Sequence, residues 1–356
     1  MNRRLFLFYL LGFFSLISIL ILKSIAPSLV DQQLIFFFLG FVLLFVLSKL
    51  DFGVVNHYSG LLYLAVIGLL VLTLLIGVVT KGSTRWIDIG SLFHIQPSQL
   101  AIPITSLFLA KIITRKDMNK VKNILQILGL LLVPAVLILI EPDLGTTVVY
   151  LLSVGTVLFF SNLSLLNLSK IVVLFLMIGV ASWLFVLKPY QKQRIFTFLN
   201  TQQDLSDTGY NARQSMVAVG SGKFFGRGVG QGVQSHLQFL PERQTDFIFA
   251  SLAEELGFLG SSILILAYVI FIAYLLFTAY RCQNQVLQLY CLSLVVMIAF
   301  QIFVNIGMNM SLVPITGVTL PLISYGGSSI LSIFLSLSVV LMIRDRDLKI
   351  TTRSFT

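Results

Sequence analysis

The stretch from Gln238 to Gly260 reads QFLPERQTDFIFASLAEELGFLG, and the rest of the chain is organised around it. It ends the long polar segment of an otherwise apolar protein and then enters a hydrophobic run. Asp246 stands near the start of that run, and Glu254 and Glu255 stand further in. Ionisable side chains at the mouth of a membrane helix, or inside it, are costly, so all three acids are candidates for function.

The composition is that of a membrane protein that crosses the bilayer many times. Of the 356 residues, 57% are hydrophobic and 11% are charged, whereas a soluble domain has about 25% charged residues. The mean hydropathy is +0.97, and apolar runs of about 20 residues recur along the chain. We therefore expect an all-α polytopic membrane protein.

Ten membrane helices are expected, with both termini on the same side. They lie at about 5–25, 33–49, 59–79, 97–113, 123–140, 144–161, 170–187, 247–278, 286–309 and 322–343. Of the 24 basic residues, 14 then fall on the side of the termini, three in short loops opposite, and seven in one long loop. Because basic residues favour the cytoplasm, both termini should be cytoplasmic.

This topology gives a single membrane domain, residues 1–356, with a long extracellular loop at 188–246. The net charge of +10 is explained largely by basic cytoplasmic loops, so we expect no nucleic-acid partner.

The eighth span is unusually long. A helix over 246–278 would measure on the order of 48 Å and exceed a hydrocarbon core of about 30 Å, so it must tilt or project. At helical spacing Asp246 shares a face with Ala250, Ala253 and Gly257, and Glu254 lies about 12 Å deeper. The two glutamates either support a broken helix or serve function.

Two other predicted outer segments carry charge. Arg85 and Trp86 are either a group held for function or an aromatic-belt tryptophan with a snorkelling arginine. In the segment Glu141-Pro142-Asp143, Asp143 is a plausible N-cap of the next helix. Capping explains Glu141 less well.

The long loop contains GSGKFFGRGVGQG at 220–232. Lys223 and Arg227 among glycine amides could cradle a phosphate, but the sequence matches no P-loop. A flexible or amphipathic segment at the membrane surface is the alternative.

Prolines and glycines also interrupt 305–330, which reads NIGMNMSLVPITGVTLPLISYGGSSI. Irregular backbone at membrane depth survives only beside protein or a water-filled cavity. We therefore expect a polar cavity here, lined by Asn305, Thr316, Ser324 and Tyr325.

Together these motifs resemble the SEDS family (shape, elongation, division and sporulation). The resemblance covers nearly the whole chain and rests on TRWIDIG, QPSQ, EPDLGT, the glycine-rich loop, FLPERQTDFIFASLAEELG and PITGVTLPLISYGGSS, in that order. QFLPERQTDFIFA and the short tails are closer to the elongation branch, RodA, than to the division branch, FtsW.

The resemblance implies a peptidoglycan glycosyltransferase of the bacterial inner membrane that polymerises lipid II into β-1,4 glycan strands and releases undecaprenyl diphosphate. Asp246 falls on the family position regarded as catalytic, and Arg85, Trp86 and Asp143 fall on positions linked to activity. The implied partners are a class B penicillin-binding protein, contacting spans eight and nine and the long loop, and other membrane proteins of the elongation complex.

The chain departs from the family pattern at three positions. Gln99 and Ile102 replace a usual glutamate and lysine, and Glu141 stands where glutamine is common. Glu141 could restore the missing negative charge, and Lys81 or Lys223 could replace the lysine.

A mechanism follows from these residues. Asp246 is the candidate base for the acceptor's 4-hydroxyl, and cations must meet the charge of the departing diphosphate. The candidates for binding substrate are Arg85, Trp86, Glu141, Asp143, Lys223, Arg227, Glu242, Arg243, Asn305 and Ser324. No cofactor is certain, although Asp246 or Glu242 could hold Mg²⁺ or Mn²⁺. The rival functions are a lipid II flippase and a non-catalytic scaffold for a transpeptidase.

Overall fold

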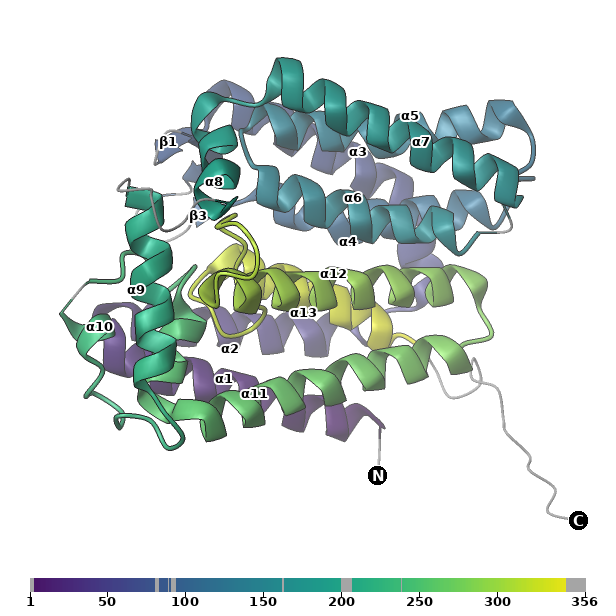
Figure 1. Ribbon diagram of the computed structural model, residues 1–356. Helices are drawn as coiled ribbons and strands as arrows, with labels where there is room; N and C mark the ends of the chain where they lie inside the picture. Colours follow the sequence, from purple (N-terminus) through teal and green to yellow (C-terminus); the bar gives the residue numbers. More distant parts are fainter. Residues whose placement is uncertain are drawn as a thin grey trace, which may run out of the picture.

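A computed structural model describes residues 3–80, 83–88, 90, 94–161, 163–199, 207–237 and 239–343. The long helices run side by side, and the short helices of the long loop gather at one end of the bundle (Figure 1). A small sheet lies at that same end. The charged candidate residues outside the apolar runs therefore come together on one side of the molecule.

Within the described residues, one apolar helix corresponds to each predicted span. These helices are α1 (Arg3–Ile25), α2 (Val30–Leu47), α3 (Phe52–Ile76), α4 (Pro97–Ile113), α5 (Val121–Ile140), α6 (Leu144–Phe159), α7 (Leu165–Ala181), α11 (Ile248–Arg281), α12 (Gln285–Asn309) and α13 (Gly327–Leu341). Seven spans are long and apolar enough to cross a membrane, whereas α4, α6 and α13 are shorter. The polytopic membrane class is confirmed, and the number of crossings and the orientation stay predictions.

The centre of the bundle is α12, which packs against α4, α6 and α11. Small polar side chains lie in these contacts: the Oγ atoms of Ser106 and Ser293 are 2.6 Å apart. On α13, Ser332 Oγ donates to the carbonyl of Gln99 at 2.7 Å. Small residues let apolar helices approach closely, and buried hydroxyls add hydrogen bonds between them.

A three-stranded antiparallel sheet follows α3, and the sequence did not predict it. Its strands are β1 (Val78–Thr80), β2 (Ser83–Asp88) and β3 (His94–Ile95), with β2 in the middle. Because β2 also contacts α3 and α4, its position over the bundle is fixed. Arg85 and Trp86 lie on this strand.

The long loop between α7 and α11 contains helices. After the π-helical turn η2 (Ser182–Val186) come α8 (Pro189–Leu199), α9 (Asp207–Ser221) and α10 (Val233–His236). Helix α9 packs against α11 and α12. Much of the predicted long loop is therefore helical and rests on the membrane helices, and its extracellular location stays a prediction.

Helix α11 is broken at Gly257, whose φ of 67° and ψ of −164° are not helical. The prediction of a continuous helix over 246–278 is therefore wrong, and so is the predicted shared face of Asp246 and Gly257. Asp246 lies before α11, which begins at Ile248. A positive φ favours glycine because other residues carry a Cβ that crowds the backbone there.

The glycine-rich loop supplies the hydrogen bonds that the break removes. The N–H groups of Phe258 and Leu259 donate to the carbonyls of Lys223 and Phe224 at 2.9 and 3.0 Å. In return, the N–H groups of Arg227 and Gly228 donate to the carbonyls of Glu254 and Glu255, both at 3.0 Å. Buried backbone groups need such partners, so this loop completes the interrupted helix.

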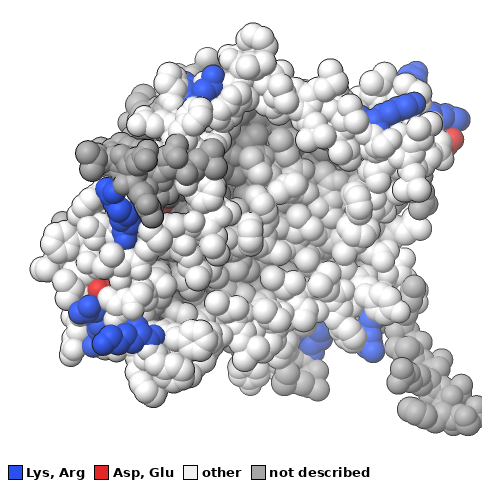
Figure 2. All heavy atoms as spheres, in the orientation of Figure 1, with Lys and Arg blue, Asp and Glu red and all other residues white. Residues whose placement is uncertain are grey.

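The surface agrees with a membrane setting. In Figure 2 the Lys and Arg side chains lie toward the two ends of the bundle, and the face between them is almost without charge. Such a band suits the hydrocarbon core, where charged side chains are costly.

Candidate active site

Asp246 sits in a turn, Glu242–Phe247, that leads into α11. The N–H groups of Thr245 and Phe247 donate to the Glu242 carbonyl at 3.1 and 3.2 Å. The Asp246 carbonyl accepts from the side-chain amides of Asn305 and Asn309 on α12, at 3.1 and 3.0 Å. Because both asparagines are fully buried, α12 fixes the backbone of Asp246 in place.

A second clamp comes from the segment before α13. Ser324 Oγ donates to the carbonyl of Thr245 at 2.7 Å, and the N–H of Tyr325 donates to the carbonyl of Gln244 at 2.9 Å. Asn305 and Ser324 were expected to line a polar cavity and bind substrate. The structure gives them a positioning role for the Asp246 turn, and direct substrate binding by them stays a prediction.

The Asp246 carboxylate lies beside a glycine of the same irregular segment. A Cβ added to Gly317 would stand 3.6 Å from Asp246 Oδ2. Gly317 has a φ of +76°, a conformation that disfavours a side chain. Its two neighbours, Thr316 and Val318, line the cavity described below, so the Asp246 carboxylate lies behind the segment 316–318 that borders that cavity.

A second polar centre joins β2 to the α5–α6 connection. Arg85 Nη2 donates to the carbonyl of Pro142 at 2.5 Å, and Arg85 Nη1 lies 3.7 Å from Asp143 Oδ1. Asp143 also caps α6: it accepts from the Thr146 N–H at 3.1 Å and from the Thr146 hydroxyl at 2.9 Å. Gln96 Nε2 adds a bond of 3.0 Å. The predicted N-cap is confirmed, and Asp143 anchors Arg85 as well.

Glu141, one residue beyond α5, is fully buried. Within the described residues, neither carboxyl oxygen has a hydrogen-bond partner. Burial raises the pKa of Glu141 to about 8; nearby Asp143 adds to the rise and Arg85 opposes it. An isolated carboxyl in such a place avoids the cost of a buried charge by holding its proton.

The cavity beside these groups has a volume of about 290 Å³. Cationic and polar side chains line part of it, namely Arg85, Gln191 and Arg194, and aliphatic or aromatic side chains line much of the rest, among them Leu144, Val148, Phe300, Val304 and Val318. The walls come from α6, α8, α12 and the segment before α13. A cationic part joined to an apolar part fits a lipid with an anionic headgroup.

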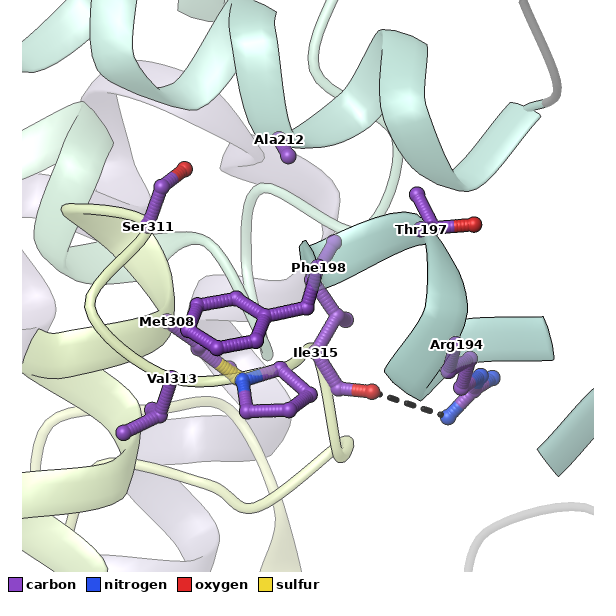
Figure 3. Close-up of a pocket in the computed structure, with 9 residues that line it drawn as sticks. Arg194, Thr197, Phe198, Ala212, Met308, Ser311, Val313 and Ile315 are labelled. Atoms are coloured by element: carbon purple, nitrogen blue, oxygen red, sulfur yellow. Dashed lines mark hydrogen bonds between the residues drawn. The ribbon is translucent and has the colours of Figure 1, made fainter. Parts of the chain in front are cut away.

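Arg194 is a residue of this site that the sequence did not single out. Its Nη1 donates to the carbonyl of Ile315 at 3.4 Å, and Figure 3 shows this bond beside Phe198 of the same helix. The smaller cavity drawn there, about 20 Å³, has room for about one water molecule. The basic character of residues 190–194 was the available signal, but only the fold of α8 brings Arg194 to the cavity.

The remaining predicted cations lie elsewhere. Arg227 Nε donates to Ser221 Oγ at 3.0 Å, and the backbones of Lys223 and Arg227 belong to the loop that completes α11. The amide nitrogens of Arg227 and Gly228, which could have cradled a phosphate, are already used. Arg243 Nε donates to the Ile25 carbonyl at 3.0 Å and ties the Asp246 turn to α1. Binding of substrate by these residues stays a prediction.

Trp86 and Glu242 are partly buried. Trp86 pairs with Val78 across the sheet, and Glu242 Oε2 accepts from the Thr245 hydroxyl at 3.3 Å. Among the described residues, no three His, Cys, Asp or Glu side chains gather as a metal site. A divalent cation at Asp246 or Glu242 would therefore need further ligands, and it stays a prediction.

The two glutamates of α11 have a structural setting. Glu254 accepts from the N–H groups of Gln234 and Ser235 at 2.8 and 3.0 Å, and from the Ser235 hydroxyl at 2.6 Å. Glu255 Oε1 accepts from Ser24 at 2.5 Å and lies 3.1 Å from His236 Nε2. The structural alternative for these acids is confirmed.

The family departures at Gln99 and Ile102 leave no unbalanced charge. Ile102 is buried in the apolar core, and the Gln99 carbonyl accepts from Ser332. Residues three apart lie on one helix face, so a glutamate–lysine pair there would be replaced by two neutral side chains. Lys81, considered as a substitute for the lysine, lies outside the described residues.

This fold and site define a polytopic membrane protein with an acid beside an amphipathic cavity, and comparisons with known proteins identify the family. The family described as "Cell cycle protein", covering FtsW, RodA and SpoVE, matches residues 1–348. The chain is 38% identical over 306 residues to the peptidoglycan glycosyltransferase MrdB of Escherichia coli K12, covering 86% of this chain and 82% of MrdB. The chain therefore belongs to the SEDS family.

Solved structures agree with this assignment. One, described as "Structural coordination of polymerization and crosslinking by a peptidoglycan synthase complex", has a TM-score of 0.81 at 30% identity and covers 94% of this chain and 96% of its own. The rod shape determining protein RodA of Thermus thermophilus has a TM-score of 0.72 at 28% identity, covering 94% of each chain. The resemblance to the elongation branch is confirmed.

Proposed function

We propose that this protein is a peptidoglycan glycosyltransferase that polymerises lipid II into β-1,4 glycan strands during cell-wall elongation. The observation that carries the proposal is the position of Asp246, whose backbone is held by α12 and whose carboxylate lies next to Gly317, between two residues that line a cavity with a cationic part and an apolar part. The names of the relatives, peptidoglycan glycosyltransferase and RodA, support it.

The reaction joins the 4-hydroxyl oxygen of the acceptor sugar to the anomeric carbon of the donor. The bond from that carbon to the diphosphate breaks, and undecaprenyl diphosphate leaves with the electron pair. The hydroxyl proton passes to Asp246, acting as general base. Diphosphate is a good leaving group once cations neutralise its charge. No second carboxyl is therefore needed as a general acid, unlike in a glycosidase.

The cavity supplies the other needs of this reaction. Arg85 and Arg194 lie where they can meet the diphosphate, and the apolar walls from α6 and α12 suit the start of the polyprenyl chain. Cations fixed before the reaction stabilise developing charge at little further cost. Four hydrogen bonds hold the backbone around Asp246 (Gln244 to Asp246) to α12 and to Ser324 and Tyr325, which favours a constant approach of the base.

We propose a class B penicillin-binding protein as the partner, on the strength of the structural neighbour in which polymerisation and crosslinking are coordinated. Helix α11 presents exposed apolar side chains along its length, including Phe258, Ile263, Leu266, Val269 and Phe277. A partner's membrane helix would lie against α11 and α12, and other membrane proteins of the elongation complex would join it. The expected location is the bacterial inner membrane.

The test is polymerisation by the purified protein with lipid II in detergent, with and without a chelator of divalent cations. A glycosyltransferase makes glycan strands there; a flippase or a scaffold makes none, because detergent has no two sides to transport between. Loss of product on chelation would support a divalent cation in the site. Absence of product under both conditions, with a monodisperse protein, would refute the proposed function.

A further inference from the structure

Glu141 is the one residue of the site whose setting the proposed reaction does not explain. Its side chain is fully buried, and both carboxyl oxygens lack a partner within the described part of the chain. Buried polar atoms rarely lack a hydrogen-bond partner. Glu254, equally buried, accepts three hydrogen bonds, so burial alone does not account for the contrast.

The groups that act on Glu141 make its ionisation unfavourable. Asp143 is a carboxylate stabilised by Thr146, Gln96 and Arg85. Glu141 also terminates α5, where the helix dipole is negative. Arg85 is the only favourable charge acting on Glu141 among the groups that shift it, and Asp143 already balances that charge.

The consequence concerns the cavity. Arg85 and Pro142 both line it, and Glu141 is the residue before Pro142. With Glu141 neutral, the charges of Arg85 and Asp143 balance each other. With Glu141 ionised, two carboxylates stand against the single charge of Arg85, and a diphosphate would meet this excess of negative charge in a poorly solvated place.

We propose that Glu141 is a positioning residue that must stay an uncharged acid for the Arg85 part of the cavity to accept the diphosphate of a lipid ligand. The proposal rests on the proposed function for the identity of that ligand. Glu141 acts through the charge balance around Arg85 and takes no part in bond making. We therefore expect the affinity for the ligand to fall when Glu141 loses its proton.

The experiment measures binding of farnesyl diphosphate to the purified full-length protein in detergent, at about pH 7.5 and about pH 9.5. The diphosphate is largely ionised over this range and arginine keeps its charge. For the wild type, with the pKa of Glu141 near 8, the affinity should fall by more than about tenfold between the two conditions. Glu141→Gln, which mimics the neutral acid in size and shape, should change by less than about twofold.

Asp88→Asn is the matched control, because Asp88 is an exposed carboxylate on the same strand as Arg85. It should keep the fall seen in the wild type. An equal fall in wild type and Glu141→Gln would overturn the proposal, and so would the loss of binding in a monodisperse Glu141→Gln protein at the lower pH. Wild type that binds no farnesyl diphosphate at either pH would overturn it too.

This readout is independent of polymerisation. A wild type that shows the pH-dependent binding and yet makes no glycan from lipid II would leave the role of Glu141 standing and remove the proposed function. A wild type that polymerises lipid II and shows no effect of pH on binding would leave the proposed function standing and refute the role of Glu141.

Discussion

Two pairs of buried acids, Glu254 with Glu255 and Glu141 with Asp143, look alike in the sequence but differ in the structure. The first pair lies at the break in α11, and its carboxylates accept hydrogen bonds from α10 and Ser24. The second pair lies near the cavity, where Asp143 accepts from Gln96 and Thr146, and Glu141 accepts from no group within the described residues.

The difference shows what separates a structural acid from a functional one. An acid that the fold has supplied with donors is stabilised as a carboxylate and holds two segments together. An acid left without donors is expensive for the fold and persists where its chemistry is used. Each prediction below compares a member of one region with a member of the other.

The largest expected effect is on stability at the α11 break. Glu254→Gln places an amide N–H against donors that now meet a carboxylate, and it should lower the free energy of unfolding by about 3 kcal/mol. Glu141→Gln removes no hydrogen bond within the described residues and, at about pH 5, where the raised pKa of Glu141 costs little, should change it by less than about 1 kcal/mol. Thermal unfolding of both purified variants in detergent checks this; equal losses would show that the two acids are equivalent.

Substitutions of the cations in the two regions should differ in their effect on the rate of polymerisation. Arg85→Ala should lower the initial rate of polymerisation by about 100-fold, because it removes a fixed positive charge from the cavity. Arg227→Ala, at the break, should lower it by less than about threefold. Arg85→Lys keeps a positive charge beside Asp143 and serves as the control for a loss of activity through misfolding. A larger loss of rate in Arg227→Ala than in Arg85→Ala would indicate that the glycine-rich loop binds the diphosphate.

A matched pair of glycines tests the wall next to Asp246. Gly317→Ala strains a φ of +76° beside the carboxylate, and Gly230→Ala strains a φ of +82° where no atom lies within 4 Å of the added Cβ. Both should cost about 1 kcal/mol of stability, but only Gly317→Ala should lower the polymerisation rate, by about tenfold. Similar rates for the two variants would mean that Gly317 does not position the base.

The last comparison concerns the dependence of stability on pH. The folded protein holds a proton on Glu141 up to about pH 8, whereas the unfolded chain releases it near its ordinary pKa of about 4.5. The native state therefore binds more protons between these values, and its stability falls as the pH rises through that window. Unfolding midpoints at pH 5, 6.5 and 8 should decline more in wild type than in Glu141→Gln. Parallel curves would show that Glu141 titrates normally.

Much of this fold could be predicted from the sequence because membrane helices are local features. Each apolar run became a helix, and the Asp143 cap was visible because its bond partners lie within three residues of it. The break at Gly257 was not predictable from α11 alone. It depends on a loop about 30 residues earlier that docks its backbone against the helix, and only the density of glycines hinted at this close approach.

The candidate site was predicted unevenly for the same reason. Asp246 and Arg85 were chosen on charge and motif, whereas Arg194 reaches the cavity only because α8 folds back over residues 314–315. Asn305 and Ser324 were placed near the site by irregular backbone around them. Their bonds to the Asp246 turn could not be predicted, because the turn was expected to be helical.

The most direct test is polymerisation of lipid II by Asp246→Asn and wild type, purified in detergent and compared at equal amounts. Asparagine keeps the size of the side chain but cannot accept the hydroxyl proton, so the rate should fall by at least about 100-fold. The variant should unfold at the same temperature as wild type, because the hydrogen bonds that fix the turn use the backbone of Asp246. A folded Asp246→Asn protein that polymerises at the wild-type rate would contradict the assignment of the base.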